Sequence, residues 1–401
     1  MKIENNSPID RYDSVQYKLD AYFDDLGETS YRKDYIDDKL NKIDNNLTVF
    51  KRKGIYHIKQ KRVYCPYCSS KEINENGYYP KKIIHEHNGK IDCKIKRYEC
   101  KKCHKGFSAD ISSFVRKNFS VTEGLIKIIQ DYYSIGFISV RKIQEIMKNM
   151  HNITISHQEV QDILVDYYVH FNPDIKEYSG RYAFDALWIK IDELGDKWVF
   201  LLTLVDTSHN TVVAYKIVEE ETEEEVYKFL REATLNQPRK GITTDLKKEY
   251  RRPIDKLGFE HQFCLFHFKK TINRKIRKYA KKHNLTGEKI KEIKSFLPEL
   301  YSVFQLENMD EVQKKFDNLR KDIKKFPQII QDILNENFLP YGKNLTKFIA
   351  NSDIEPTTNS IERIFEDLSP KHIKKKFKTV RGFLSRFNLK LKRWDSRNAI
   401  Y

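Results

Sequence analysis

The sequence lacks any long hydrophobic run. Its longest apolar segment, Trp198–Val205, has the length of a single strand, whereas a helix that spans a bilayer needs about 20 mostly apolar residues. The N-terminal residues MKIENNSPIDRYDS are polar and contain no apolar stretch of the kind that secretory signals carry. These absences exclude a membrane-spanning protein and predict a soluble, cytoplasmic one.

Acidic residues are in deficit. Lys and Arg together number 74 against 57 Asp and Glu, which gives a net charge of +17. An excess of positive charge spread over a whole chain favours a polyanionic partner, most simply nucleic acid. A lysine-rich proteome is the alternative explanation, because the chain is also rich in Ile, Asn and Tyr. Charge alone leaves both explanations open.

Neither an internal repeat nor a low-complexity linker divides the 401 residues, which provide room for two to four domains. Hydrophobic residues make up 39% of the chain, enough for a buried core. Periodicity and composition predict an N-terminal helical region, a segment of short strands rich in Cys and aromatic residues, and a helical segment. These three segments are residues 1–60, 61–112 and 113–178.

The second half alternates strand and helix patterns, which predicts an α/β core. Strand patterns dominate residues 179–268, and one strand is expected across Phe259–His267. Lysine-rich helical spacing then runs through residues 269–350, which we interpret as a helical insertion. Residues 351–401 hold a further helix and a basic tail.

Four of the six cysteines form two CxxC pairs, Cys65 with Cys68 and Cys100 with Cys103. Each CxxC turn supplies two thiolates to one side of a tetrahedron, so two turns complete a four-thiolate zinc site. The zinc would be structural, because four thiolates leave no open coordination position. Four unligated cysteines at this spacing are the alternative.

The segment between the two pairs has the strand pattern of a zinc ribbon, with a turn at Asn88–Gly89. Lys and Arg residues alternate there with Tyr98 and Phe107, a mixture that suits contact with a phosphate backbone. Cys93 is expected to pack as a small hydrophobic residue, and His104 is an alternative zinc ligand.

The segment after the ribbon predicts three helices. Gly136 interrupts the helical pattern of Val121–Met147, and Ser156 with Glu159 has the spacing of a capping box ahead of a last helix. Such a unit is similar to a helix-turn-helix, whose final helix enters the major groove. The last helix is not strongly basic, and an ordinary helical packing domain is the alternative.

Three acidic residues occupy positions where carboxylates can converge. Asp185 lies inside an apolar strand, where a charged group is costly to bury unless it pairs or binds metal. Asp245 ends another apolar strand, and Glu362 lies at the start of a helix. As alternatives, Asp245 caps the next helix, and Glu362 forms a capping box with Asn359.

The order of these motifs resembles the DDE transposases of prokaryotic insertion sequences, especially the Mutator-like group. In that family a strand carries the first Asp, a later strand ends in the second, and a helix supplies the Glu. The T-N-x-x-E pattern of the family matches Thr358–Glu362, and its C-x-x-H motif matches Cys264–His267. The resemblance covers about residues 61–395 and includes the zinc ribbon and helix-turn-helix.

The resemblance implies an RNase H-like core in which Asp185, Asp245 and Glu362 bind two Mg²⁺ or Mn²⁺ ions. Water would attack a phosphodiester at an element end, and the freed 3′-hydroxyl would attack target DNA. The implied partner is double-stranded DNA, as terminal inverted repeats and target. The resemblance also implies a homo-oligomer on DNA and a nucleoid-associated location.

Three other functions remain open from the sequence. They are a domesticated, non-cleaving DNA-binding regulator, an RNase H-like nuclease without strand transfer, and a zinc-stabilised scaffold. The last leaves Asp185, Asp245 and Glu362 unexplained.

Cys264 and His267 are candidate accessory residues. On a continuous strand, positions i and i+3 point to opposite faces, so the two side chains meet only if the strand ends there. A core cysteine and a turn histidine are the alternative, and neither residue is a candidate nucleophile.

The C-terminal segment Lys371–Arg393 contains no acidic residue, and Phe and Leu recur between its Lys and Arg residues. As a helix it would dock on the catalytic core with its positive side toward DNA. A solvated charged face is the alternative.

Overall fold

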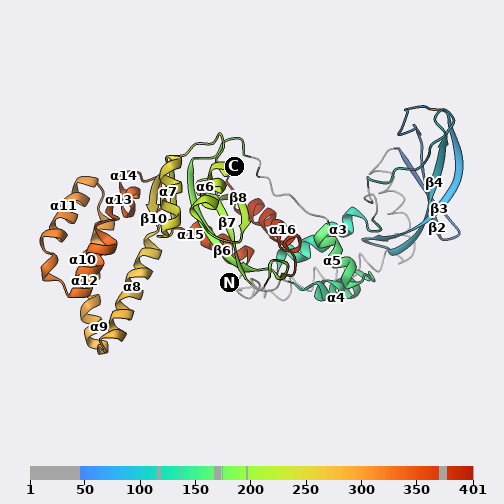
Figure 1. The fold of residues 1–401 in the computed structure, drawn as a ribbon. Coiled ribbons are helices and arrows are strands. Elements are labelled where there is room, and N and C mark those ends of the chain that lie inside the picture. The colour runs from blue at the N-terminus through green and yellow to red at the C-terminus, as the bar shows by residue number, and fades with distance from the viewer. Residues whose placement is uncertain are drawn as a thin grey trace, which may run out of the picture. The chain divides into compact units, whose positions relative to one another are not determined.

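The computed structural model describes residues 46–113, 115, 119–136, 138–166, 173, 175–195, 197–369 and 377–400. The chain divides into two compact units, Met1–Tyr167 and Tyr168–Tyr401. Each unit is described by itself (Figure 1). None of the helices in the described residues combines the length and apolarity that a bilayer span would require.

A five-stranded sheet forms the described N-terminal part of the first unit. Its strands run in the order β1-β2-β4-β3, and β5 pairs with β4. The strands are β1 (Leu47–Arg52), β2 (Ile55–Gln60), β3 (Ile73–His85), β4 (Gly89–Cys100) and β5 (Gly106–Ser108). Alternation explains the strands: in β4, Ile91, Cys93 and Ile95 are buried, with Asp92 and Lys94 between them.

The N-terminal helical region predicted for residues 1–60 is wrong for its last part, because β1 and β2 occupy residues 47–60. The cause is a two-residue turn at Lys53–Gly54, both with positive φ, which pairs β1 with β2. The segment TVFKRKGIYHIK has the apolar alternation of a hairpin, which outweighs its charge. Residues 1–45 lie outside the described residues.

Three helices follow in the first unit: α3 (Glu123–Ile135), α4 (Val140–His151) and α5 (His157–Asp166). The helix spacing predicted from the sequence is confirmed, and Gly136 ends α3. The predicted capping box is also confirmed, because Ser156 N–H donates to Glu159 Oε2 (2.8 Å) and Glu159 N–H donates to Ser156 Oγ (3.1 Å).

The second unit contains a five-stranded mixed sheet in the order β10-β9-β6-β7-β8. Its strands are β6 (Arg181–Lys190), β7 (Trp198–Asp206), β8 (Thr211–Val218), β9 (Gly241–Thr244) and β10 (Glu260–Phe263). Strands β6, β7 and β8 pair antiparallel, whereas β9 runs parallel to β6 and β10 parallel to β9. The predicted mixed α/β character of this half is confirmed.

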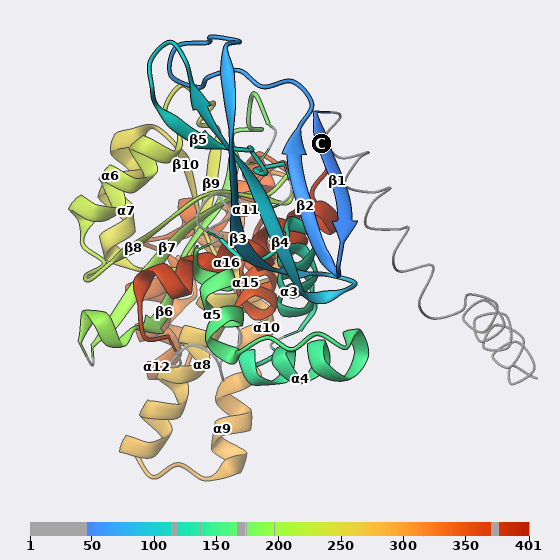
Figure 2. The ribbon, with the colours of Figure 1, turned by 90° about the vertical axis from the view of Figure 1, so that its right-hand side faces the viewer.

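Helices cover both faces of this sheet (Figures 1 and 2). Tyr182 and Phe184 of β6 point to the face covered by α6 (Glu223–Ala233) and α7 (Lys248–Leu257). Ala183 and Leu187 point to the face covered by α15 (Asn359–Leu368) and α16 (Val380–Asn398). Apolar residues therefore occupy both odd and even positions of β6, as expected for a strand that is buried on both faces.

Helices also form a separate hydrophobic core beside the edge strand β10. This core is centred on Phe268, Phe316 and Phe338. The helices are α8 (Leu265–Lys282), α9 (Gly287–Lys294), α10 (Leu297–Tyr301), α11 (Met309–Lys321), α12 (Gln328–Ile333), α13 (Gly342–Leu345) and α14 (Lys347–Ala350). A π-helical turn (Leu334–Phe338) continues α12, and single-turn 3₁₀ helices occur at Asp192–Leu194, Ser302–Gln305 and Ile323–Lys325.

The C-terminal helix α16 docks on the sheet as the sequence suggested. Phe383, Phe387 and Leu391 are buried in the core that α15 shares with β6 and β7. Its N-terminus is capped by Thr379, whose Oγ1 accepts from Gly382 N–H (3.0 Å). Residues 370–376, which belong to the predicted basic tail, lie outside the described residues.

Candidate functional site

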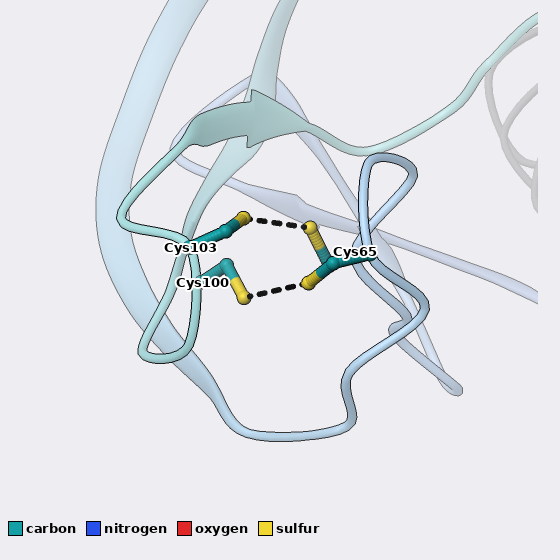
Figure 3. Close-up of side chains that lie close together, drawn as sticks. Cys65, Cys100 and Cys103 are labelled. Atoms are coloured by element: carbon teal, nitrogen blue, oxygen red, sulfur yellow. Dashed lines mark hydrogen bonds between the residues drawn. The ribbon is translucent and has the colours of Figure 1, made fainter.

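The four CxxC cysteines of the first unit meet in one cluster. Cys65 Sγ lies 3.6 Å from Cys103 Sγ, and Cys68 Sγ lies 3.6 Å from Cys100 Sγ. All four sulfurs are within 4.8 Å of one another, and Figure 3 shows the thiols from the two turns facing each other. Tetrahedral zinc with Zn–S bonds of about 2.3 Å separates its sulfurs by about 3.8 Å, so the cluster is compatible with structural zinc.

The thiols of this cluster differ in acidity, because desolvation and hydrogen bonds with the other cysteines raise the pKa of Cys68 to about 12, whereas the pKa of Cys100 is lowered. Hydrogen bonds from the backbone N–H groups of Cys103 and Lys102 lower the pKa of Cys100 to about 6, and a metal ligand must be deprotonated. Ser69 and His104 each follow the fourth residue of a CxxC turn with positive φ, the tight geometry that lets both thiols point inward. His104, the alternative ligand, is not part of the cluster.

The fifth cysteine of this unit, Cys93, packs in the sheet core at 2% exposure. Burial raises the pKa of its thiol to about 12, so it remains a neutral, apolar group. The expectation that Cys93 acts as a small hydrophobic residue is confirmed.

We predict that Cys100→Ser removes zinc and unfolds the ribbon, whereas Cys93→Ser retains the metal. A structural zinc site contributes on the order of 10 kcal/mol to folding. Metal content per chain and proteolysis of residues 46–113 measure the two effects. All three tryptophans, Trp188, Trp198 and Trp394, lie in the second unit, so their fluorescence checks that this unit is unaffected. Equal metal content in both variants would contradict the assignment.

Strand register brings the two aspartates of the second unit together. Strand β6 pairs in parallel with β9, and the last pair in this ladder is Phe184 with Thr244. Asp185 and Asp245 are each one residue farther along, so they lie side by side where β9 ends. By parity they share the face of Ala183, which packs against α15.

The pKa of Asp185 reflects this crowding. Burial of its carboxyl group and the neighbouring Asp245 carboxylate raise the pKa of Asp185 to about 7. A hydrogen bond of 2.8 Å from Ala186 N–H to Asp185 Oδ1 partly offsets the shift. Two adjacent carboxylates in a desolvated position are destabilising unless a proton or a cation neutralises one of them.

Asp245 does not cap the following helix. Its Oδ1 accepts a hydrogen bond from Lys247 N–H (3.0 Å). Lys247 is the N-cap residue of α7. The Lys247 ammonium group is 2.6 Å from Glu221 Oε2, and Tyr250 hydroxyl donates to the other Glu221 oxygen. Asp245 is therefore not the N-cap of α7, and the alternative of a capping residue is wrong.

Glu362 approaches the aspartates from α15. This helix begins at Asn359 and its N-cap is Thr358, so Glu362 cannot form the capping box with Asn359 that the sequence left open. Glu362 Oε1 is buried and accepts no hydrogen bond from the described residues, although His267 Nε2 is 3.3 Å away. Asp185, His267 and Glu362 line one cavity of about 330 Å³.

Cys264 and His267 are joined by a helical turn. The strand predicted across Phe259–His267 is wrong beyond Phe263, because β10 ends there and Cys264 is the N-cap of α8. Residues i and i+3 lie on one side of a helix, whereas on a strand they would point apart. The hydrogen bond with Cys264, together with the Asp185 and Glu362 carboxylates, raises the pKa of His267.

Cys264 also connects three parts of the second unit. Its N–H donates to Thr244 O (2.7 Å), just before Asp245. Its Sγ accepts from Thr358 N–H and Thr358 Oγ1, both at 3.3 Å, just before α15. Thr358 Oγ1 in turn lies 3.4 Å from His267 Nδ1. These contacts place the start of α15 against the end of β9.

The donor set of Asp185, Asp245 and Glu362 fits divalent metal ions. All three donors are carboxylates, which Mg²⁺ and Mn²⁺ prefer. The raised pKa of Asp185 and the orphaned Oε1 of Glu362 are both features that a bound cation would relieve. Within the described residues the three carboxylates do not form a cluster as close as that of the cysteines.

Comparison with known proteins gives one full-length similarity. The chain is 27% identical over 404 residues to the insertion element ISM1 uncharacterized 48.3 kDa protein of Methanobrevibacter smithii, covering 99% of each chain. No family model matches the sequence. Among solved structures, a chain of the simian T-cell lymphotropic virus intasome complex is 16% identical, and 42% of this chain and 67% of that chain are covered. Its TM-score of 0.19 is too low to indicate a shared fold.

We predict that Asp185→Asn stabilises the metal-free protein at neutral pH. Folded Asp185 keeps its proton up to about pH 7, but the unfolded chain loses it near pH 4. The free energy of unfolding therefore falls as pH rises between about 4 and 7. At about 1.4 kcal/mol per pKa unit, a gain of a few kcal/mol is the upper limit for the variant.

Denaturant unfolding of the second unit, followed by tryptophan fluorescence without added Mg²⁺ or Mn²⁺ at about pH 4 and pH 8, measures this difference. The matched control is Asp192→Asn on the same chain segment, where the side chain is exposed. The stabilisation by Asp185→Asn should vanish at the lower pH, and an equal difference at both values would refute the pKa argument.

Proposed function

We propose that the protein is a DDE-type DNA transposase that binds element ends and catalyses metal-dependent strand cleavage and strand transfer. One observation carries the proposal: Asp185 and Asp245 lie on adjacent strands, and α15 brings Glu362 to the same face of the sheet. The full-length similarity to an insertion element protein supports the same class. Asp185, Asp245 and Glu362 are the proposed catalytic residues.

The strand arrangement supports the RNase H-like core that the sequence resemblance implies. Asp185 is on the first strand of a mixed sheet, and Asp245 follows a strand that lies parallel beside it. Helices α8–α14 occupy most of the long interval between Asp245 and Glu362. These helices have a separate hydrophobic core, so the interval can fold without altering the sheet. The chain after the insertion then brings Glu362 close to Asp185 and Asp245.

Asp185, Asp245 and Glu362 would hold two Mg²⁺ or Mn²⁺ ions. Such ions, when bound, supply the charge that activates water or a 3′-hydroxyl and stabilises the leaving oxygen. Asp185, Asp245 and Glu362 are each partly buried, which limits the screening of their charges by water. Lys270 lines the same cavity and is suited to contact a phosphate oxygen of the scissile strand.

His267 is the proposed positioning residue for Glu362. Its Nδ1 faces Thr358 and its Nε2 faces Glu362, so the ring joins the first turn of α8 to the first turn of α15. Cys264 holds the same two turns through Thr358. The pair would orient the third carboxylate and would not react with DNA, in keeping with partners that orient metal ligands in other sites.

The first unit is the proposed reader of terminal inverted repeats. An exposed basic residue of the ribbon lies beside an aromatic ring where Lys105 lies over Tyr67 (4.8 Å). Helices α3–α5 are the proposed helix-turn-helix. Helix α4 carries Arg141, Lys142 and Lys148, whereas α5 is acidic, so phosphate contacts are expected from α4 and the ribbon. Two ends must be joined, which predicts a homo-oligomer on DNA.

The decisive measurement is cleavage of labelled duplex DNA that spans the flanks of the gene, with Mg²⁺ or Mn²⁺. We expect nicking at a defined terminal position that EDTA abolishes. Asp185→Asn, Asp245→Asn and Glu362→Gln should each lower the rate by at least about 10³-fold, whereas DNA affinity stays within about threefold. Asp192→Asn, an exposed aspartate on the same segment, is the matched control.

Two results would redirect the proposal. Tight binding without cleavage in either metal would indicate a domesticated, non-cleaving DNA-binding regulator. Cleavage without joined products would indicate a nuclease of the same fold.

A second prediction concerns His267. His267→Ala should lower the cleavage rate about 10- to 100-fold, the usual cost of losing a group that orients a metal ligand. Because the defect lies in metal binding, the concentration of Mn²⁺ that gives half-maximal rate should rise, and excess metal should restore part of the activity. His283→Ala, at the other end of α8, is the control. An unchanged metal dependence would show that His267 does not act through Glu362.

A further inference from the structure

We propose that a basic cavity between α7, α8 and the helical insertion binds a backbone phosphate of the DNA strand next to the scissile bond. The inference deepens the proposed transposase function and rests on it for the identity of the strand. Its volume is about 450 Å³, enough for one nucleotide unit, and it adjoins the carboxylate cavity.

Two pairs of cations face this cavity. Lys247 and Arg251 come from the start of α7, and Lys270 and Arg274 come from the first turns of α8. Each pair is spaced i, i+4, so both members lie on the same side of their segment. Asn337 and Tyr341 contribute hydrogen-bonding groups from the opposite wall.

Two of these cations lack counter-ions. Among the described residues, neither Lys270 nor Arg274 forms an ion pair with an acidic side chain. Lys247 is paired with Glu221, and Asp245 is the one acidic residue that lines the cavity. Like charges gathered around a concave surface repel one another, and an anion bound between them removes that repulsion.

Contacts with Tyr341 and Leu246 fix the position of the Arg251 guanidinium group. Its guanidinium lies over the Tyr341 ring at 4.3 Å, with Nη1 donating to Tyr341 Oη (2.9 Å) and Nη2 donating to Leu246 O (3.1 Å). Its Nε is buried and has no hydrogen-bond partner among the described residues. A buried unpaired donor costs free energy, and Arg251 is one of the residues that line the cavity.

The position next to the carboxylates identifies the ligand class. His267 and Lys270 line both cavities, so the basic cavity continues directly from the one that holds Asp185 and Glu362. When the scissile phosphate of a DNA strand lies at the carboxylates, the neighbouring phosphate of that strand requires a positive charge to neutralise it. The basic cavity supplies that charge through Lys270 and Arg274.

The test is DNA binding by zinc-loaded full-length protein without added Mg²⁺ or Mn²⁺, measured by fluorescence anisotropy of a labelled duplex over a range of salt concentrations. Lys270→Ala/Arg274→Ala should weaken binding about tenfold and lower the magnitude of the salt slope by about two, because each lost phosphate contact lowers it by about one. Both side chains are exposed, so the fold is retained.

The charge-matched control is Lys289→Ala/Lys291→Ala on α9, which removes two exposed lysines outside the cavity. If both double variants lost DNA affinity equally, the proposed phosphate site would be wrong, and DNA binding would be due to a diffuse positive surface. Unchanged binding by the cavity variant would overturn it as well. Millimolar inorganic phosphate or a mononucleotide should not displace the duplex; displacement at these concentrations would overturn DNA as the ligand.

These measurements separate the cavity from the proposed activity, because binding without added Mg²⁺ or Mn²⁺ requires no cleavage. If wild type cleaves DNA but the cavity variant binds normally, only the cavity is wrong. If only the cavity variant loses DNA affinity and wild type does not cleave DNA, the result supports the DNA-binding cavity and contradicts the proposed transposase activity.

Discussion

The geometry of the candidate active site depends on the contacts of one buried residue, Cys264. Its backbone N–H bonds the end of β9, and its thiol accepts two hydrogen bonds from Thr358, which is 94 positions away in sequence. Closing so long a loop costs conformational entropy, which grows slowly with loop length. The helical core of the insertion offsets that cost before Thr358 returns to the sheet. Together with the packing of α15 on the sheet, this junction positions Glu362 relative to the aspartates.

Electrostatic imbalance is the second constraint on this half of the protein. On one side of His267, Asp185 and Glu362 line a partly buried acidic cavity, where the pKa of Asp185 is raised and one Glu362 oxygen has no hydrogen-bond donor among the described residues. On the other side, Lys270 and Arg274 have no counter-ion in the described part of the chain. A folded protein tolerates such unpaired groups at a cost in stability, and they cluster where ligands bind. Divalent cations and a phosphodiester backbone together would neutralise both sides.

Local patterns in the sequence predicted much of this arrangement. The CxxC pairs, the capping box at Ser156 and Glu159, and the helices after the ribbon depend on contacts between near neighbours, and the structure contains all of them. The strand expected across Phe259–His267 was wrong beyond Phe263, where β10 ends. The apolar residues of FEHQFCLFHF fit the period of a strand and that of a helix, so only tertiary contacts decide where the strand ends. The hairpin at residues 47–60 was missed because its charges hid an alternating pattern.

By itself, the sequence determined which residues can serve as ligands and which segments become helices or strands, because thiol spacing, capping and periodicity act over a few residues. It also placed Asp185, Asp245 and Glu362 in an order that pointed to one chemistry. Only the tertiary structure decided that Cys264 and His267 share a helical turn, that Glu362 lacks a cap partner, and that a basic cavity adjoins the acids. Those features arise from strand register and from a loop closed over 94 positions, and such long-range contacts leave no local signal in a single sequence.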